Sequence, residues 1–157
     1  MLTAADTPIR LRPAQPDDAD AIGELVHELQ REMGMPQALS QAQLQAMLGA
    51  PDSSILLAVV DGVVAGLLSY NVCQGLLHGG ASFRIEDLIV GSTFRRRGIS
   101  RTLLAEAELQ ALRLGCVELE VTTLEDNLSA RDLYRSAGFV GGAILMEKDL
   151  PDQTGAE

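Results

Sequence analysis

Residues 90–101 read Val90-Gly91-Ser92-Thr93-Phe94-Arg95-Arg96-Arg97-Gly98-Ile99-Ser100-Arg101, so that an apolar run, a basic loop and a helix start follow one another directly. The first turn of a helix carries backbone N–H groups without intrahelical partners, and the helix dipole adds roughly half a positive charge there. Gly98 and the small Ser100 leave room for a phosphate to approach the backbone, while arginines supply forked donors. The order of these parts predicts an anion site, although three consecutive arginines can also form a solvated face.

The length of the chain predicts one domain over 1–157 with a sizeable core. The chain has 157 residues, 46% of them hydrophobic, and a net charge of −10 that argues against binding nucleic acid or anionic membranes. No apolar run approaches the roughly 18 residues of a membrane span, and no signal-peptide pattern opens the chain. Two cysteines and two histidines without a cluster predict neither a disulfide framework nor a metal site, so we expect a cytoplasmic protein.

The apolar periodicity and the turn residues predict alternating strands and helices. The expected helices cover 16–29, 41–48, 98–114 and 127–137. The expected strands cover 9–12, 55–60, 63–70, 83–90 and 116–122, with a closing hairpin at 139–140 and 144–146. A glycine-containing loop is expected at 73–82, and a frayed tail at 152–157.

The element order is therefore βααβββαβαββ, an α/β (α+β) arrangement around a mixed, mostly antiparallel sheet with helices on both faces. The Asp61-Gly62 turn makes its flanking strands antiparallel, whereas the crossover through 98–114 makes strands 83–90 and 116–122 parallel. Because ligands bind at the carboxyl ends of parallel strands, we expect the basic loop and Asn127 to lie at one cleft.

Two motifs resemble the GCN5-related N-acetyltransferase (GNAT) family. The basic loop has neither G-x-x-x-x-G-K-[ST] nor G-x-G-x-x-G, but it is similar to the R-x-x-G-x-[GA] loop that binds the acyl-CoA pyrophosphate, with Ser100 where Gly or Ala is usual. About thirty residues later, Asn127 to Phe139 reads N-x-x-A-x-x-L-Y-x-x-x-G-F, which resembles the family's Asn–Tyr–Gly-Phe segment. The resemblance covers roughly residues 9–150.

The resemblance implies acetyl-CoA as co-substrate, without a metal, and it implies the residues that bind acetyl-CoA. They are Leu88, Ile89, Val90, Arg95, Arg96, Arg97, Gly98, Ile99, Ser100, Arg101 and Asn127. Unpaired backbone groups of Leu88 and Val90 are expected to bind the thioester carbonyl and the pantetheine amides. Asn127 is also a good helix cap, and both roles can hold through different atoms.

Tyr134 is the candidate general acid, because a phenol near the thioester sulfur can protonate the CoA thiolate as it leaves. The alternative is a packing tyrosine whose hydroxyl merely finds a partner. The I-E-D-L strand resembles that of small-amine acetyltransferases, so Glu86 is the candidate base and Asp87 a candidate substrate ligand. Neighbours on a strand point to opposite faces, so both acids reach one cleft only if a bulge intervenes. The alternative is two acids that are merely exposed or face a basic neighbour.

The predicted activity is transfer of the acetyl group of acetyl-CoA to a primary amine by direct attack, with a small cationic amine favoured. A protein N-terminal or lysine acetyltransferase and a non-catalytic acyl-CoA-binding module are the alternatives. The family resemblance also suggests a homodimer. The acceptor amine itself is beyond what the sequence specifies.

Overall fold

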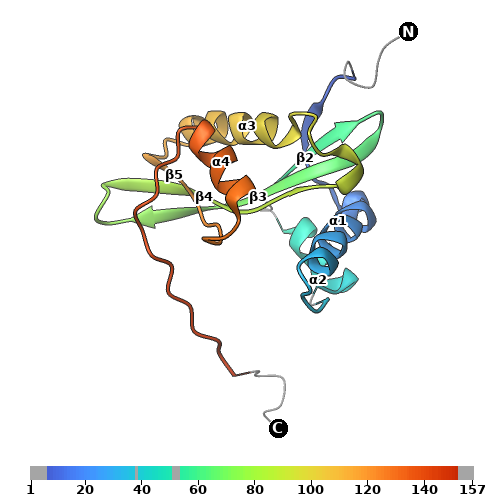
Figure 1. Cartoon of the computed structure of the whole chain (residues 1–157), viewed down its shortest axis with the longest axis horizontal. Coiled ribbons are helices and arrows are strands. Elements are labelled where there is room, and N and C mark those ends of the chain that lie inside the picture. The colour runs from blue at the N-terminus through green and yellow to red at the C-terminus, as the bar shows by residue number, and fades with distance from the viewer. Residues whose placement is uncertain (1–6, 38, 51–53, 152–157) are drawn as a thin grey trace. The chain divides into compact units, whose positions relative to one another are not determined.

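The computed structural model describes residues 7–37, 39–50 and 54–151, so the tail expected at 152–157 lies outside the described residues (Figure 1). The chain divides into two compact units, Met1–Val121 and Thr122–Glu157. The first unit carries the sheet and three α-helices, and the second carries one α-helix. None of the helices within the described ranges is both long and apolar enough to cross a lipid bilayer.

The sheet of the first unit has five strands in the order β1-β2-β3-β4-β5. The strands are β1 (Arg10–Pro13), β2 (Ile55–Val60), β3 (Val63–Gly75), β4 (Gly80–Val90) and β5 (Glu118–Val121). The pairs β1/β2, β2/β3 and β3/β4 are antiparallel and β4/β5 is parallel, as the turn and the crossover predict. The mixed, mostly antiparallel sheet is thereby confirmed.

Helices α1 (Ala19–Glu32) and α2 (Gln41–Gly49) pack against one face of the sheet. Ile22 and Leu25 of α1 and Leu44 of α2 are buried against sheet residues that include Leu67 and Ile89. A reciprocal capping box starts α2: Gln43 N–H donates to Ser40 Oγ (3.2 Å), and Ser40 N–H donates to Gln43 Oε1 (2.9 Å). Burial of one apolar stripe on each helix therefore fixes this layer.

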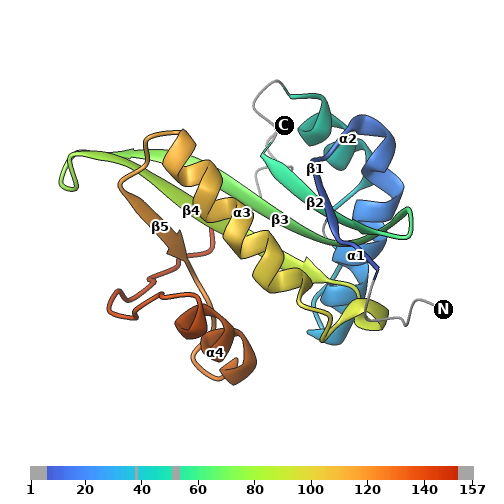
Figure 2. The same cartoon turned by 90° about the horizontal axis from the view of Figure 1, so that it is seen from above.

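Helix α3 (Ile99–Arg113) lies along the sheet, as Figure 2 shows. It buries Ile99, Leu103, Leu104, Ala107 and Ala111, which recur at helical spacing. A Cβ built on Gly66 of β3 would lie 3.2 Å from Ile99 Cγ2, so the helix rests close against this strand. The helices thus cover both faces, and α3 begins directly after the carboxyl end of β4.

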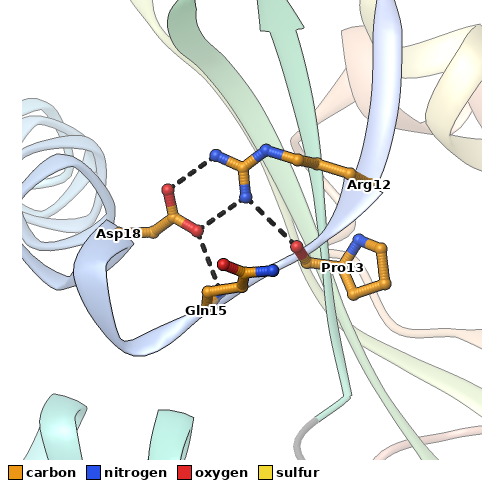
Figure 3. Close-up of polar contacts among 4 residues, drawn as sticks. All are labelled: Arg12, Pro13, Gln15 and Asp18. Carbon is orange, nitrogen blue, oxygen red and sulfur yellow. Dashed lines mark hydrogen bonds and ion pairs between the residues drawn. The ribbon is translucent and has the colours of Figure 1, made fainter.

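An ion pair joins the end of β1 to the turn that precedes α1 (Figure 3). Arg12 donates from Nη1 and Nη2 to the two oxygens of Asp18, both at 2.7 Å, and Gln15 N–H donates to Asp18 Oδ2 at 2.8 Å. These bonds lower the pKa of Asp18, with the Arg12 hydrogen bond as the largest cause. The short 3-10 helix η1 (Pro16–Asp18) places this carboxylate at the helix start, so α1 begins three residues after the predicted position.

The prediction of a loop over 73–82 is wrong, because β3 continues to Gly75 and β4 begins at Gly80. The glycines there allow close approach rather than a loop: a Cβ on Gly80 would lie 2.7 Å from Val117 Cγ1. Only the tip between the strands turns, and Leu76 and Leu77 on it are fully exposed or nearly so.

The second unit holds α4 (Leu128–Ser136), which Gly138 follows with φ +92°. The closing hairpin expected at 139–140 and 144–146 does not form: residues 139–151 contain no strand, and Val140, Ile144 and Met146 are each about 90% exposed. Segments of two and three residues offer few ladder bonds, and an isolated hairpin is at best marginally stable in water.

Candidate acetyl-CoA and amine site

The loop between β4 and α3 has the shape of an anion site. After the 3-10 helix η2 (Ser92–Phe94), Arg96 adopts φ +63° and Gly98 φ +79°, both left-handed. The first intrahelical bond of α3 runs from Thr102 N–H to Gly98 O (3.0 Å), so the N–H groups of residues 99–101 precede the helical ladder. No atom lies within 4 Å of a Cβ built on Gly98, so this side of the backbone is open.

The predicted arginines of this loop are not equivalent. Arg95 donates from Nη2 to Glu32 Oε2 (2.7 Å) and from Nε to the Val90 carbonyl (3.2 Å), and the Glu32 bond is the main cause of its raised pKa. The guanidinium of Arg97 lies 5.5 Å from the centre of the Phe94 ring. Arg96 and Arg101 are exposed, as is Gly98, whereas Ile99 is buried and Ser100 partly buried.

Within the described residues β5 pairs with β4 only over residues 82–85, so β4 has no strand partner on its outer edge beyond Ile85. Gly91 N–H donates to Ala65 O on β3 (2.9 Å). Because backbone direction alternates along an antiparallel strand, Ile89 also faces β3, and the polar groups of Leu88 and Val90 face the outer edge. The backbone groups of Leu88 therefore face the outer edge and their role in binding stays a prediction, whereas the Val90 carbonyl is already bonded to Arg95 and the Ile89 side chain belongs to the core.

A β-bulge brings Glu86 and Asp87 to the same face of the sheet. Ser69 pairs with Asp87 while the next residue, Tyr70, pairs with Ile85, so Glu86 is the extra residue on β4. Ser69 Oγ donates to Asp87 Oδ2 at 2.5 Å, and Asn71 Nδ2 donates to Glu86 Oε1 at 3.1 Å. Because Ser69 and Asn71 are two apart on β3, their side chains share one face, and so do the two carboxylates.

We call Ser69, Asn71, Arg84, Glu86, Asp87 and Glu120 the polar patch. Arg84 and Glu120 are register partners on β4 and β5, joined by two contacts: Nε to Oε2 at 3.0 Å and Nη2 to Oε2 at 2.9 Å. The patch continues the sheet face that α1 and α2 cover elsewhere, since Leu67 and Ser69 are two apart on β3. It carries three acids against one base.

Sequence reasoning missed Ser69, Asn71, Arg84 and Glu120. The alternation on β3 and β5 contains them, but only the strand register, bulge included, shows that they meet the two acids. Glu32 was also missed, because nothing near it in the sequence pairs it with a loop more than sixty residues away.

Tyr134 and Asn127 belong to the second unit, so their place beside the loop and β4 stays a prediction. Within that unit Asn127 Oδ1 accepts from Ala130 N–H (3.1 Å) and caps α4, which leaves the amide nitrogen for another partner. Tyr134 is partly buried and meets Phe139 edge to face, with ring centroids 5.7 Å apart. Burial raises the pKa of the Tyr134 phenol, which therefore carries its proton at neutral pH.

Comparison with known proteins decides the family. A model of the acetyltransferase (GNAT) family matches residues 22–139. The chain belongs to the GNAT family of acetyltransferases. This confirms the resemblance seen in the two motifs, and the enzyme is an acetyl-CoA-dependent N-acetyltransferase.

Two curated relatives come from Salmonella typhimurium. An aminoalkylphosphonate N-acetyltransferase is 32% identical over 125 residues, which is 80% of this chain and 79% of the relative. An aminoglycoside N(6′)-acetyltransferase type 1 is 25% identical over 109 residues, which is 68% of this chain and 75% of the relative.

Solved structures confirm the fold. A possible acetyltransferase from Clostridium difficile 630 superposes with a TM-score of 0.79 at 19% identity, covering 92% of this chain and 99% of the other. An aminoglycoside N-acetyltransferase in complex with CoA gives a TM-score of 0.75 at 19% identity, covering 96% and 100% of the two chains. Within the described ranges of this acetyltransferase, no group of three or more His, Cys, Asp or Glu side chains is placed to hold a metal ion.

Proposed function

We propose that this acetyltransferase moves the acetyl group of acetyl-CoA to the primary amine of a small cationic molecule by direct attack. The observation that carries the proposal is the bulge in β4, which sets Glu86 and Asp87 on one face with a hydrogen-bond donor held against each. A carboxylate can take the proton that the acceptor ammonium must lose before its nitrogen attacks, and a second can hold another positive charge of the acceptor. Glu86 takes the first role and Asp87 the second.

The pyrophosphate of acetyl-CoA binds, in this proposal, to the N–H groups that open α3. Support comes from the left-handed Gly98, the open space at its Cβ position and the exposed Arg96 and Arg101. Ser100 adds a hydroxyl donor where the family has a smaller residue. The outward N–H and carbonyl of Leu88 hold the thioester end.

Tyr134 protonates the CoA thiolate as it leaves, and Asn127 uses its amide nitrogen on the pantetheine arm. The raised pKa of the Tyr134 phenol suits this role, because the acid must hold its proton at the pH of reaction. The Asn127 cap fixes the start of α4 and leaves the nitrogen for the cofactor arm. The enzyme works in the cytoplasm, in keeping with its free Cys73 and Cys116, and as a homodimer, on the family resemblance alone.

A coupled assay of CoA release over a panel of amines tests the function. The panel holds polyamines, aminoglycosides, aminoalkylphosphonates, amino acids and short peptides. We expect turnover to be greatest with acceptors that carry a second positive charge, and Asp87→Asn to raise KM for those acceptors more than for monoamines. Turnover confined to peptides would replace the proposal with protein acetylation, and acetyl-CoA binding without release for every amine would replace it with a binding module.

An aminoalkylphosphonate is the second candidate acceptor, favoured by the 32% identity to an enzyme named for that substrate. Its amine would meet the same carboxylates, while its phosphonate requires a cation such as Arg84. Because Arg84 is already paired with Glu120, this acceptor has to compete with a carboxylate for the guanidinium. Glu120→Gln would then lower KM for the phosphonate, whereas KM for a diamine would stay the same or rise.

A further inference from the structure

One stripe of α1 contacts the acetyl-CoA loop at three points. Leu25 Cδ2 would lie 3.1 Å from a Cβ built on Gly91, so no side chain fits there without displacing the leucine. Glu28 Oε1 accepts from Ser92 N–H at 2.9 Å, and Glu32 Oε2 accepts from Arg95 Nη2 at 2.7 Å. The spacing of 25, 28 and 32 puts these side chains on one helix face. The first half of the loop is therefore docked onto α1.

The side chains of α1 at these contacts are negatively charged, and negative charge by itself disfavours a bound phosphate. Two carboxylates, Glu28 and Glu32, stand beside a loop that has to accept a diphosphate. The pKa of Glu28 is lowered, chiefly by its Ser92 bonds and in smaller part by Arg95 and Arg31, so this group stays ionised. A carboxylate at this place repels an anion and so weakens phosphate binding. The contacts that the two carboxylates make with the loop must favour binding by more than this repulsion.

Arg95 already donates hydrogen bonds to two other groups of the protein. Its Nε holds the Val90 carbonyl at the end of β4, and its Nη2 holds Glu32 on α1. The guanidinium thus bridges the last residue of the strand, the loop and the helix, whereas the sequence predicts it as a pyrophosphate ligand. The next residue, Arg96, takes a left-handed φ that is strained for a non-glycine residue. Something must hold the chain in that conformation.

We infer that Arg95 is a positioning residue: with Glu32 it ties the loop to α1 and presents the N–H groups of α3 to acetyl-CoA, and it does not bind the pyrophosphate itself. The inference rests on the proposed function of the loop. The pair adds little to the stability of the fold, because both side chains are about 40% exposed or more. Its effect is therefore expected in acetyl-CoA binding rather than in the unfolding temperature.

Calorimetric titration with acetyl-CoA alone, without an acceptor, distinguishes the two roles of Arg95 by sign. If Arg95 bound phosphate directly, Glu32→Gln would release a competing carboxylate and tighten binding. If Arg95 positions the loop, Glu32→Gln weakens binding by about 3- to 5-fold, because an exposed ion pair that holds the loop is replaced by a weaker neutral contact. Glu24→Gln, an exposed acid of the same helix, is the matched control for the loss of one negative charge and should leave the affinity within about twofold.

A charge swap supplies the rescue. Arg95→Glu and Glu32→Arg each place like charges together and weaken binding, whereas the double variant restores an ion pair of opposite polarity. We expect the double variant to bind acetyl-CoA at least about threefold more tightly than Arg95→Glu alone, with kcat kept and KM for acetyl-CoA recovered. A double variant as weak as Arg95→Glu, or tighter binding by Glu32→Gln, overturns the inference and leaves the proposed function standing. A wild-type enzyme that does not bind acetyl-CoA overturns both.

Discussion

Alanine in place of Gly98 separates the role of this residue in folding from its role in binding. Gly98 has φ +79°, and no atom lies within 4 Å of the new Cβ, so the free protein meets no steric clash. Only the left-handed conformation is strained, at about 1–2 kcal/mol. For a chain of this size the unfolding temperature should fall by roughly 2–8 °C.

Gly115 is the matched control at the other end of α3. Its φ is +71°, and again no atom lies within 4 Å of a built Cβ. Gly115→Ala should therefore lower the unfolding temperature as much as Gly98→Ala does. Only at position 98 does the methyl group stand beside the N–H groups proposed for the pyrophosphate.

The two variants should differ in their affinity for acetyl-CoA. Losing one hydrogen bond to a charged group costs about 1.5–3 kcal/mol, which raises the dissociation constant by about 10- to 150-fold for Gly98→Ala. Gly115→Ala should bind like the wild type. Thermal melts and calorimetric titration of both variants provide the comparison. Equal affinities, or an equal loss in both variants, would refute the pyrophosphate site, and Gly98→Val extends the test with a larger side chain.

Three further predictions concern catalysis and stability. Tyr134→Phe should lower kcat by about 100-fold or more at neutral pH with little change in acetyl-CoA affinity, because only the proton donor is removed; a parallel loss of both in stopped assays and titrations would contradict the acid role. Glu86→Gln should lower kcat/KM chiefly at acidic pH, where more amine is protonated, and a pH–rate profile like that of the wild type would leave Glu86 without a catalytic role. Asp18→Asn should lower the free energy of unfolding by about 1 kcal/mol at pH 7. Since the pKa of Asp18 is lowered in the folded state, that difference is present above its unfolded pKa and vanishes as the pH falls through the folded one, which urea titrations at several pH values measure.

The strongest sequence signals gave the central sheet and its helices correctly. These signals are local, and each specifies one type of local structure. They are the Asp61-Gly62 turn, the apolar stripe of α3 and Gly115, at which α3 ends. The predictions of a loop at 73–82 and of a closing hairpin were wrong for different reasons. In the first segment Gly80 packs closely against Val117, and in the second the apolar runs are too short to pair.

The sequence names the two acids of the candidate site, but neither their geometry nor the polar residues that they meet. The resemblance of the I-E-D-L strand names Glu86 and Asp87, yet whether they share a face depends on a bulge that only the pairing of β3 with β4 reveals. The guanidinium of Arg95 likewise pairs with Glu32, a residue far away in sequence. Long-range register and long-range ion pairs carry no periodic signal, so the sequence leaves them open.

The extra residue in β4 makes this strand tolerant of a one-residue deletion at the bulge. Ahead of Glu86 the apolar side chains of β4 turn towards α3, and behind it Ile89 turns towards α1 and α2. Deleting position 86 would give an unbroken pleat in which Ile85, Leu88 and Ile89 all keep their present neighbours. The domain could then assemble as before with one acid in place of two, so the insertion adds a second carboxylate to this face without being needed for the packing of the sheet.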